Sequence, residues 1–206
     1  FLLFLTSIIK AVDDYQDLLR VSVASAGNDH RLGANEAPPA IVSIFLGDEL
    51  TEILKSIEND TSYICKEKSP MEIGVRVLPK FFKDTTDRNR TSPFAFTGNK
   101  FEFRMLGSAF SIAGANIVLN TIVAEELRQF ADILENSSNF DEDLNTLIKN
   151  TIKSHNKIIF NGNNYSNDWV KEAEKRGLLN LKTTPDALPS FVNSKNVELF
   201  TKHHVL

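Results

Sequence analysis

The amino-acid sequence predicts an α+β fold, in which an antiparallel sheet is flanked by helices and followed by a helical C-terminal portion. Three observations predict it: helical periodicity at both ends of the chain, strand-like segments in the middle, and an element order that differs from the alternation of a doubly wound sheet. The 206 residues, 42% of them apolar and 24% charged, suffice for one core of good size.

Helical periodicity opens the chain. Apolar residues over positions 1–20 share one helical stripe, which consists of Phe1, Leu5, Ile8, Val12, Tyr15 and Leu19. Residues 25–39 (SAGNDHRLGANEAPP) break this periodicity with Gly, Asn and Asp, and predict a loop. The apolar run 40–47 is too short to be assigned to a strand or a helix. Residues 48–59 predict a short helix that turns its leucines and isoleucines inward.

Strand-like segments follow. Residues 71–82 (MEIGVRVLPKFF) alternate with period two around Ile73, Val75 and Val77, which predicts a strand. Residues 84–106 predict a loop and a strand, then a turn at 97–99 (TGN), then a second strand.

The second half of the chain is mainly helical. A long helix is expected from near Ala115, with one face formed by Leu119, Val123, Leu127, Phe130 and Leu134. Residues 136–143 predict a polar break, and residues 144–159 another helix. The next helix has Ser166 or Asn167 as its N-cap and Gly177 beyond its end. Residues 183–206 predict a loop and then a helical segment. We divide the chain into two regions, 1–135 and 136–206.

Charge and cysteine content limit the classes of function. The net charge of −4 provides no general attraction to nucleic acid or to an anionic membrane, so neither is expected as a partner. Cys65 is the single cysteine, so no internal disulfide can form; a structural thiol in a reducing, cytoplasmic setting is favoured. Lys10 and Asp13 interrupt the N-terminal apolar run too early for a membrane span, and we expect both chain ends to be truncations.

The segment KFEFR is the most informative for chemistry. On a strand, Lys100, Glu102 and Arg104 share one face at intervals of roughly 7 Å, while Phe101 and Phe103 face the core. A carboxylate between two cations can bind a divalent ion, and the cations can bind phosphate or carboxylate oxygens. The alternative is a solvated strand face paired with itself, which the pattern alone favours.

Two further segments carry basic residues and a carboxylate. Arg88 and Arg90 lie two residues apart on extended backbone and can converge on one polyanion. In the loop 25–39, Arg31 could bind a substrate carboxylate and Glu36 could close over it. His30 in the same loop is expected to be a hydrogen-bonded structural histidine.

Three other features are discounted. The segment NGNNYS (161–166) lacks the GK[ST] ending of a phosphate-binding P-loop. His203 and His204 have no partner at metal-ligand spacing in the sequence. The N-x-[ST] triplets are attributed to chance, since nothing indicates secretion.

The segments HRLGANEAPP, RNRTSPFAFTGNKFEFR, NGNNYSNDWVKEAEKRGL and LLNLKTTPDALPSF together resemble glutamine synthetases, the type III subfamily in particular. The resemblance covers nearly the whole chain and implies that the chain is part of the family's catalytic domain. The implied reaction uses ATP to phosphorylate the γ-carboxylate of glutamate, after which ammonia displaces phosphate to give glutamine. The implied cofactors are ATP, as substrate, and Mg²⁺ or Mn²⁺.

The resemblance implies a role for each motif residue. Arg31 and Arg104 would bind the glutamate substrate. Glu36 would be the loop carboxylate that shields the intermediate from water and helps deprotonate ammonium. Arg90 would stabilise phosphoryl transfer.

The remaining roles concern the nucleotide and the metal. Lys100 would lie on the nucleotide side and Glu102 would ligate the metal nearer the ATP phosphates. Ala95 stands where other types have a second arginine, so the resemblance leaves Arg88 to share the nucleotide role with Arg90. Lys100 replaces a common arginine, which keeps the charge but loses the bidentate geometry.

The resemblance also implies an assembly. Active sites would form between subunits of a ring-shaped homo-oligomer, a dodecamer by family resemblance, and the other metal ligands would lie upstream of this chain. The chain alone is therefore expected to be inactive. Two alternatives remain open: a ligase that joins glutamate to a larger amine, and a non-catalytic structural member of the fold.

Overall fold

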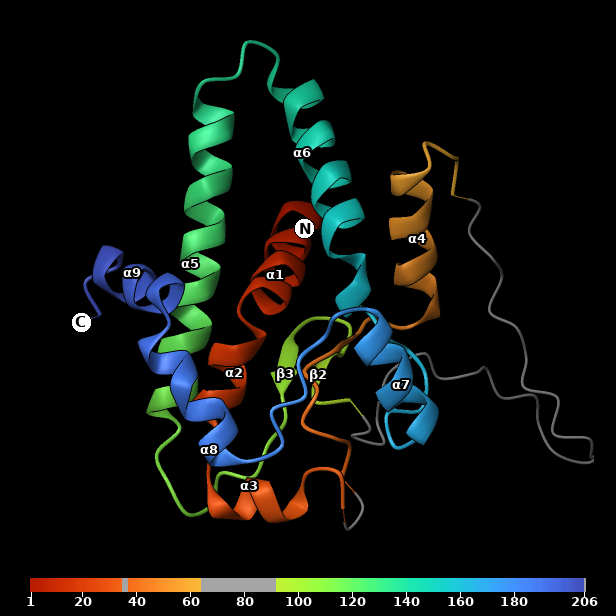
Figure 1. The fold of residues 1–206 in the computed structure, drawn as a ribbon. Helices are drawn as coiled ribbons and strands as arrows, with labels where there is room; N and C mark the ends of the chain where they lie inside the picture. Colours follow the sequence, from red (N-terminus) through yellow and green to blue (C-terminus); the bar gives the residue numbers. More distant parts are fainter. Residues whose placement is uncertain (35–36, 64–91, 206) are drawn as a thin grey trace, which may run out of the picture.

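The structure, a computed structural model, describes residues 1–34, 37–63 and 92–205 (Figure 1). The strand predicted over 71–82 and the single cysteine, Cys65, lie outside the described residues. Within them the fold is α+β, as predicted, with a small sheet among many helices.

The first segment folds as two helices rather than one. Helix α1 spans Leu2–Asp14 and α2 spans Gln16–Ser22. The backbone breaks at Tyr15, which has φ −123° and ψ 33°. The predicted stripe is nevertheless confirmed beyond Phe1, because Leu5, Ile8 and Val12 are buried.

The prediction of a loop over 25–39 is wrong for its first part. Helix α3 spans Ala26–Arg31, and its N-cap Ser25 accepts a hydrogen bond from the Asn28 backbone N–H at 3.2 Å. A serine cap and an acidic first turn stabilise a helix start even in a sequence rich in Gly and Asn. The short helix predicted over 48–59 is confirmed as α4, Asp48–Glu58.

The sheet contains β1 (Ile44–Phe45), β2 (Phe94–Phe96) and β3 (Phe101–Phe103), in the spatial order β1-β2-β3. Strands β2 and β3 form the predicted antiparallel hairpin, in which Ala95 lies opposite Glu102. Gly98 has φ +95° in the connecting turn, a conformation that glycine adopts without strain. Strand β1 pairs with β2 in parallel, so the sheet is mixed and the prediction of an antiparallel sheet is wrong for this pair.

The second half is helical, as predicted, with shifted boundaries. Its elements are α5 (Ala113–Glu135), α6 (Phe140–His155), η1 (Asn156–Ile158), α7 (Asn167–Lys175), α8 (Thr184–Ala187), η2 (Leu188–Val192) and α9 (Ser194–Lys202). The polar break ends early, at Asn139, because three acidic residues in the first turn of α6 suit a helix N-terminus. The N-cap of α7 is Ser166, one of the two predicted residues.

The predicted stripe of α5 is confirmed in part. Phe130 is buried, and Leu119 and Val123 are partly buried and pack against the core, but Val118 and Ile122, outside the stripe, are buried as well. Glu125 and Glu126 are also buried, and cationic side chains contact them. A hydrophobic periodicity cannot reveal buried carboxylates of this kind.

The core lies where α1 packs between α5 and α6 (Figure 1). Leu5, Ile9, Ile122 and Ile152 are buried there and belong to one apolar cluster. The cluster joins the regions 1–135 and 136–206, whose boundary stays a prediction. Among the described residues, no helix is both long and apolar enough to cross a bilayer.

Candidate active site

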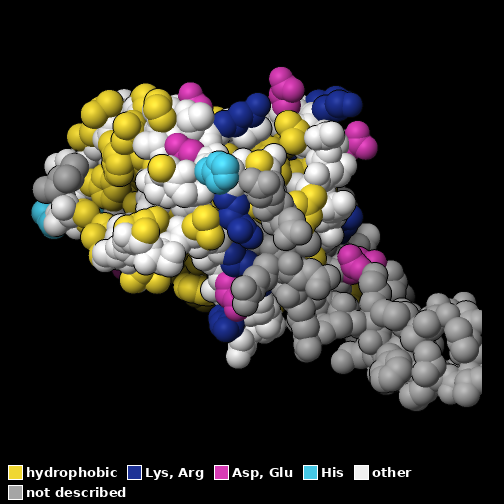
Figure 2. Space-filling model, turned by 90° about the horizontal axis from the view of Figure 1, so that it is seen from below, with side chains coloured by type: hydrophobic (Ala, Val, Ile, Leu, Met, Phe, Trp, Pro, Cys, Tyr) yellow, Lys and Arg dark blue, Asp and Glu magenta, His cyan; other side chains and the backbone are white. Residues whose placement is uncertain are grey.

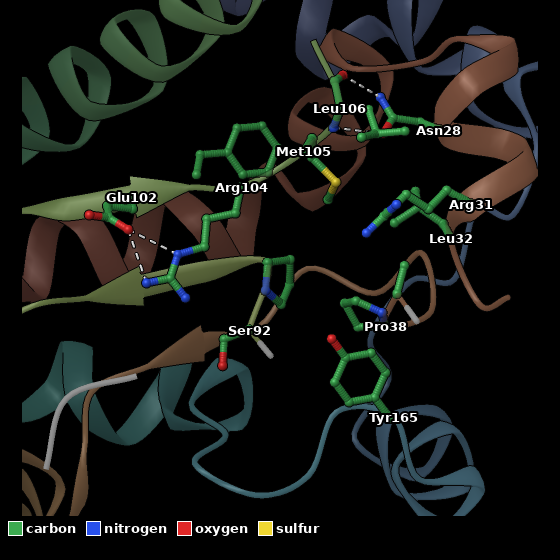
Figure 3. Close-up of a pocket in the computed structure, with 13 residues that line it drawn as sticks. Asn28, Arg31, Leu32, Pro38, Ser92, Glu102, Arg104, Met105, Leu106 and Tyr165 are labelled. Atoms are coloured by element: carbon green, nitrogen blue, oxygen red, sulfur yellow. Dashed lines mark hydrogen bonds and ion pairs between the residues drawn. The ribbon is translucent and has the colours of Figure 1, made fainter. Parts of the chain in front are cut away.

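A cavity of about 1010 Å³ opens where β3, the C-terminal end of α3 and the loop before α7 meet (Figure 3). Its described lining comprises Asn28, Arg31, Leu32, Ala37, Pro38, Ser92, Pro93, Glu102, Phe103, Arg104, Met105, Leu106 and Tyr165. Three of the predicted site residues, Arg31, Glu102 and Arg104, therefore border one space. They come from segments about seventy positions apart in the sequence, which the fold brings together.

The face of β3 has the predicted arrangement. The Glu102 carboxylate lies between two cations: Lys100 Nζ is 3.2 Å from Oε1, and Arg104 Nε and Nη2 are each 3.0 Å from Oε2. The hydrogen bonds from Lys100 and Arg104 hold the pKa of Glu102 below its usual range. The alternative prediction, in which the charged residues of this strand face pair with one another, is therefore confirmed for these ion pairs. The pairing and the cavity coexist, because Glu102 and Arg104 also line it.

The two phenylalanines anchor this strand. The Phe101 and Phe103 rings lie 5.7 Å and 6.0 Å from the Phe94 ring, centroid to centroid, and pack against the core. Tilted ring pairs at this distance stabilise a hairpin beyond their burial. The polar face of the strand is thereby turned toward the cavity.

Arg104 and Lys100 differ in their surroundings. The Arg104 side chain is 14% exposed and its guanidinium is oriented by Glu102, whereas the Lys100 side chain is 64% exposed and is absent from the described lining. A fixed guanidinium can bind a carboxylate through two parallel hydrogen bonds. The Lys100 ammonium is therefore a solvent-exposed charge beside Glu102 rather than a group held in the cavity.

Asn28 fixes α3 against the end of β3. Its side-chain amide donates to the Val23 carbonyl at 2.7 Å and to the Leu106 carbonyl at 2.9 Å, and its Oδ1 accepts from the Leu106 N–H at 3.0 Å. The residue is buried, so these bonds are shielded from water. Arg31, three residues further along α3, is therefore held at the cavity, although its own side chain is exposed.

A buried ion pair holds the other side of α3. Arg20, 1% exposed, donates from Nη2 to Asp29 Oδ1 at 2.7 Å, and the Thr184 N–H donates to Asp29 Oδ2 at 2.6 Å. Burial raises the pKa of Asp29, but the hydrogen bonds from Thr184 and Arg20 outweigh it and lower the pKa overall. Helix α3 is thus tied to the C-terminal region as well as to the strand.

The predicted residues that remain fall into two groups. Glu36, Arg88 and Arg90 lie outside the described residues. His30 is exposed and is absent from the described lining. The face of the molecule seen from the α3 side carries a strip of Lys and Arg side chains (Figure 2). This local positive charge suits anionic ligands despite the net charge of −4.

Two lining residues were missed from the sequence, Asn28 and Tyr165. The position of Asn28 three residues after the capping Ser25 is the one signal for it in the sequence. Its side chain is held at the cavity by hydrogen bonds to Leu106, which is far away in the sequence. Tyr165 belongs to the segment 161–166, which was set aside because it lacks a P-loop ending. No sequence periodicity marks either residue as part of a cavity.

A second cluster could in principle hold a metal. Ligand atoms of Asp13, Asp14 and His155 lie within 4.8 Å of one another. The Asp13 carboxylate is, however, 2.7 Å from His155 Nδ1 and 3.5 Å from Lys157 Nζ, and Lys10 Nζ is 2.6 Å from Asp14. Cations already balance these carboxylates, so the cluster is a structural link between α1 and the end of α6.

Comparison with known proteins gives the following matches. Residues 143–206 match the family model described as the glutamine synthetase C-terminal domain. Over the whole chain, the sequence is 52% identical to the protein named type-3 glutamine synthetase from Dictyostelium discoideum, of which the match covers 28%. It is also 47% identical, over the whole chain and 29% of the relative, to a glutamine synthetase from Butyrivibrio fibrisolvens.

A third relative agrees with these. The glutamine synthetase from Bacteroides fragilis (strain YCH46) is 44% identical over 95% of this chain and 28% of its own length. The chain thus spans less than a third of the length of the relatives that it matches.

Proposed function

The chain is similar over its whole length to glutamine synthetases, one of them named type-3, and we propose that the protein carrying it ligates ammonia to L-glutamate in an ATP-dependent reaction. The reaction would pass through γ-glutamyl phosphate. The observation that carries this proposal is the convergence of Arg31, Glu102 and Arg104 on one cavity.

Arg31 and Arg104 would bind the glutamate substrate. Two guanidinium groups at the border of one cavity can bind the carboxylates of a dicarboxylic amino acid through charge-assisted hydrogen bonds. Because Glu102 already orients the Arg104 guanidinium, little side-chain entropy is lost when substrate binds. Such positioning holds the γ-carboxylate where a phosphoryl group can be transferred to it.

Glu102 fits a role as metal ligand. Its lowered pKa keeps it ionised at neutral pH. Oε2 accepts from two N–H groups of Arg104, whereas Oε1 contacts Lys100 and has a second lone pair that could bind a metal ion. Bound Mg²⁺ or Mn²⁺ would screen the charge of the phosphoryl groups. Among the described lining residues Glu102 is the one carboxylate, so other ligands would come from elsewhere in the protein.

The nucleotide would be bound by Lys100, Arg88 and Arg90. Lys100 supplies an exposed ammonium next to Glu102. Arg90 would stabilise the charge that develops in phosphoryl transfer. Glu36 would exclude water from the acyl phosphate and take a proton from ammonium.

The proposed assembly is a ring-shaped homo-oligomer in the cytoplasm, a dodecamer by family resemblance. The chain spans 28% of its type-3 relative, and the other metal ligands would come from the rest of the protein. We therefore propose that residues 1–206 have no ligase activity when isolated.

The test is an assay of the full-length protein with glutamate, ATP and Mg²⁺. We expect glutamine and phosphate in equal amounts with ammonium as the amine. Polyamines at the same concentration should neither form product nor compete with ammonium. Efficient ligation of a polyamine would replace the proposal with a γ-glutamyl-amine ligase, and absence of any ligation would overturn it in favour of a structural role.

A further inference from the structure

Helix α3, which carries Arg31, is too short to hold its own place. It has six residues, whereas isolated helices shorter than about 12–15 residues are marginal in water. Arg31 is the last of the six, and the C-cap Leu32 already has extended backbone, with φ −65° and ψ 123°. The position of Arg31 therefore depends on bonds between α3 and the rest of the fold.

Asp29 uses both of its carboxylate oxygens for bonds of this kind. Oδ1 accepts from Arg20 Nη2 at 2.7 Å, and Oδ2 accepts from the Thr184 N–H at 2.6 Å. The Arg20 side chain is 1% exposed, so the ion pair is largely shielded from water. Both bonds are charge-assisted, and they act two residues before Arg31 in the same helix.

The partners of Asp29 are themselves held in place. Arg20 Nε donates to the Leu181 carbonyl at 2.7 Å, and its Nη2 also donates to the Lys182 carbonyl at 3.2 Å. Thr184 is the first residue of α8, whose N-cap Thr183 forms a capping box. Figure 1 shows α3 and α8 at the same end of the molecule. Asp29 thus bonds α3 to backbone that other contacts already fix.

Asn28 and Asp29 attach α3 in two directions. Asn28 bonds Leu106 beyond β3, whereas Asp29 bonds α2 and α8. Successive side chains of a helix point about 100° apart, so the two attachments differ in direction. Together they prevent a short helix from rotating about its axis, and this rotation decides where Arg31 points.

We propose that Asp29 is a positioning residue of the glutamate site, whose bonds to Arg20 and Thr184 fix the rotation of α3 and thereby place Arg31 where a substrate carboxylate binds. The inference rests on the proposed function, in which Arg31 binds glutamate, and extends it to a residue outside the described lining of the cavity. Thr184 lies in the region matched by the C-terminal domain model, so this region contributes to glutamate affinity.

The experiment compares Asp29→Ala with wild type in the full-length protein. A small displacement of a binding group weakens its contact with the substrate, so KM for glutamate should rise about tenfold. We expect kcat and KM for ATP to change less than about twofold, since Arg31 binds glutamate equally in the ground and transition states. Asp29→Asn keeps one oxygen that can accept from Arg20, and should raise KM for glutamate by less, about threefold.

A double variant tests whether Asp29 acts through Arg31. Arg31→Ala should raise KM for glutamate at least about tenfold, because charge-assisted bonds to a substrate carboxylate are lost. Adding Asp29→Ala to Arg31→Ala should then change this KM by less than about twofold, since the residue that Asp29 positions is already absent. If Asp29→Ala does not fold, the same comparison is made with Asp29→Asn.

Asp13→Ala is the matched control, because it also breaks a buried ion pair. Asp13 is 6% exposed, contacts His155 and Lys157, and is absent from the described lining of the cavity. The substitution should lower the melting temperature, as Asp29→Ala does, while KM for glutamate stays at its wild-type value.

The outcomes separate the two proposals. If Arg31→Ala raises KM for glutamate and Asp29→Ala does not, the role of Asp29 is wrong while the proposed function stands. Effects that multiply in the double variant, or an equal rise of KM in Asp13→Ala, would also overturn the inference. If wild type makes no glutamine, or if Arg31→Ala keeps the wild-type KM, the proposed function fails in the part on which the inference rests.

Discussion

At the scale of single residues, the Arg104 guanidinium is held in a fixed orientation by Glu102 in addition to carrying a positive charge. Its Nε and Nη2 both lie 3.0 Å from Glu102 Oε2, and its side chain is 14% exposed. Lysine would keep the charge but lose the planar fork that binds a carboxylate through two bonds. The proposed function depends on this geometry.

Arg104→Lys in the full-length protein is therefore expected to raise KM for glutamate about tenfold or more, with a smaller effect on KM for ATP. Arg128→Lys, on the outer part of α5, is a control with the same chemical change, and should leave both constants as in wild type. An unchanged KM for glutamate in Arg104→Lys would remove this residue from the substrate site.

Asn164 shows how a residue outside the cavity shapes it. The Asn164 side-chain amide donates a hydrogen bond to Ser43 Oγ, just before β1, and Ser92 Oγ, just before β2, lies 3.4 Å from Asn164 Oδ1. Asn164 therefore links the loop before α7 to the segments that lead into both strands. Sequence alone marked this residue only as part of an N-x-[ST] triplet. Its complete burial favours a structural role instead.

We expect Asn164→Ala to lower the free energy of unfolding by about 1–3 kcal/mol, because it leaves buried polar groups without a partner. Urea unfolding of the full-length protein measures the change. Asn120→Ala removes an exposed amide from α5 and should stay within about 0.5 kcal/mol of wild type. Equal stability of both variants would show that the Asn164 bonds do not hold the loop.

At the scale of elements, the polar face of the β2–β3 hairpin could be predicted and helix α3 could not. Alternating Phe and charged residues determine which face of β3 is buried, since the side-chain period of a strand is two. Helix α3 depends on Ser25, Asn28 and Asp29, and two of these bond to Leu106 and Thr184. Those contacts exist only after folding, so local composition indicated a loop.

Helix α9 is attached to α5 through one buried carboxylate. Lys202 Nζ lies 2.8 Å from Glu125 Oε1, and His203 Nε2 lies 2.8 Å from Oε2, while Arg128 and Gln129 of α5 bond the same group. Burial raises the pKa of Glu125, but these hydrogen bonds outweigh it and hold the pKa well below its usual range.

The sign of the pH dependence follows from this lowered pKa. The carboxylate stabilises the fold fully above its unfolded pKa of about 4.3, and this stabilisation is lost as the pH falls toward the folded value. Glu125→Gln should therefore destabilise the protein at pH 7, by about 1–3 kcal/mol, and show a weaker loss of stability on acidification.

Amide hydrogen exchange of α9 measures the effect on this element. Exchange should be faster in Glu125→Gln than in wild type at pH 7, and the difference should diminish below about pH 4. Glu135→Gln, at the end of α5, is the control with the same substitution. Identical exchange in Glu125→Gln and wild type would show that the carboxylate does not anchor α9.

At the scale of the whole molecule, the two regions share one core and one cavity. Helix α6 of the second region packs on α1, and Tyr165 borders the space lined by Arg31 and Glu102. The α+β class, the hairpin and the Arg31, Glu102 and Arg104 set were predictable from local patterns and motifs. The cavity itself was not, because its lining depends on contacts between distant segments.

The proposed ligase site depends on Glu102, and the most direct test is metal-dependent glutamine formation by the full-length protein carrying Glu102→Ala. We expect wild type to be active and the variant to lose at least about a hundredfold in turnover, since a metal ligand and the partner of Arg104 are both removed. Glu174→Ala, an exposed carboxylate on α7, should keep wild-type activity. Wild-type glutamine formation and metal dependence in Glu102→Ala would contradict the account.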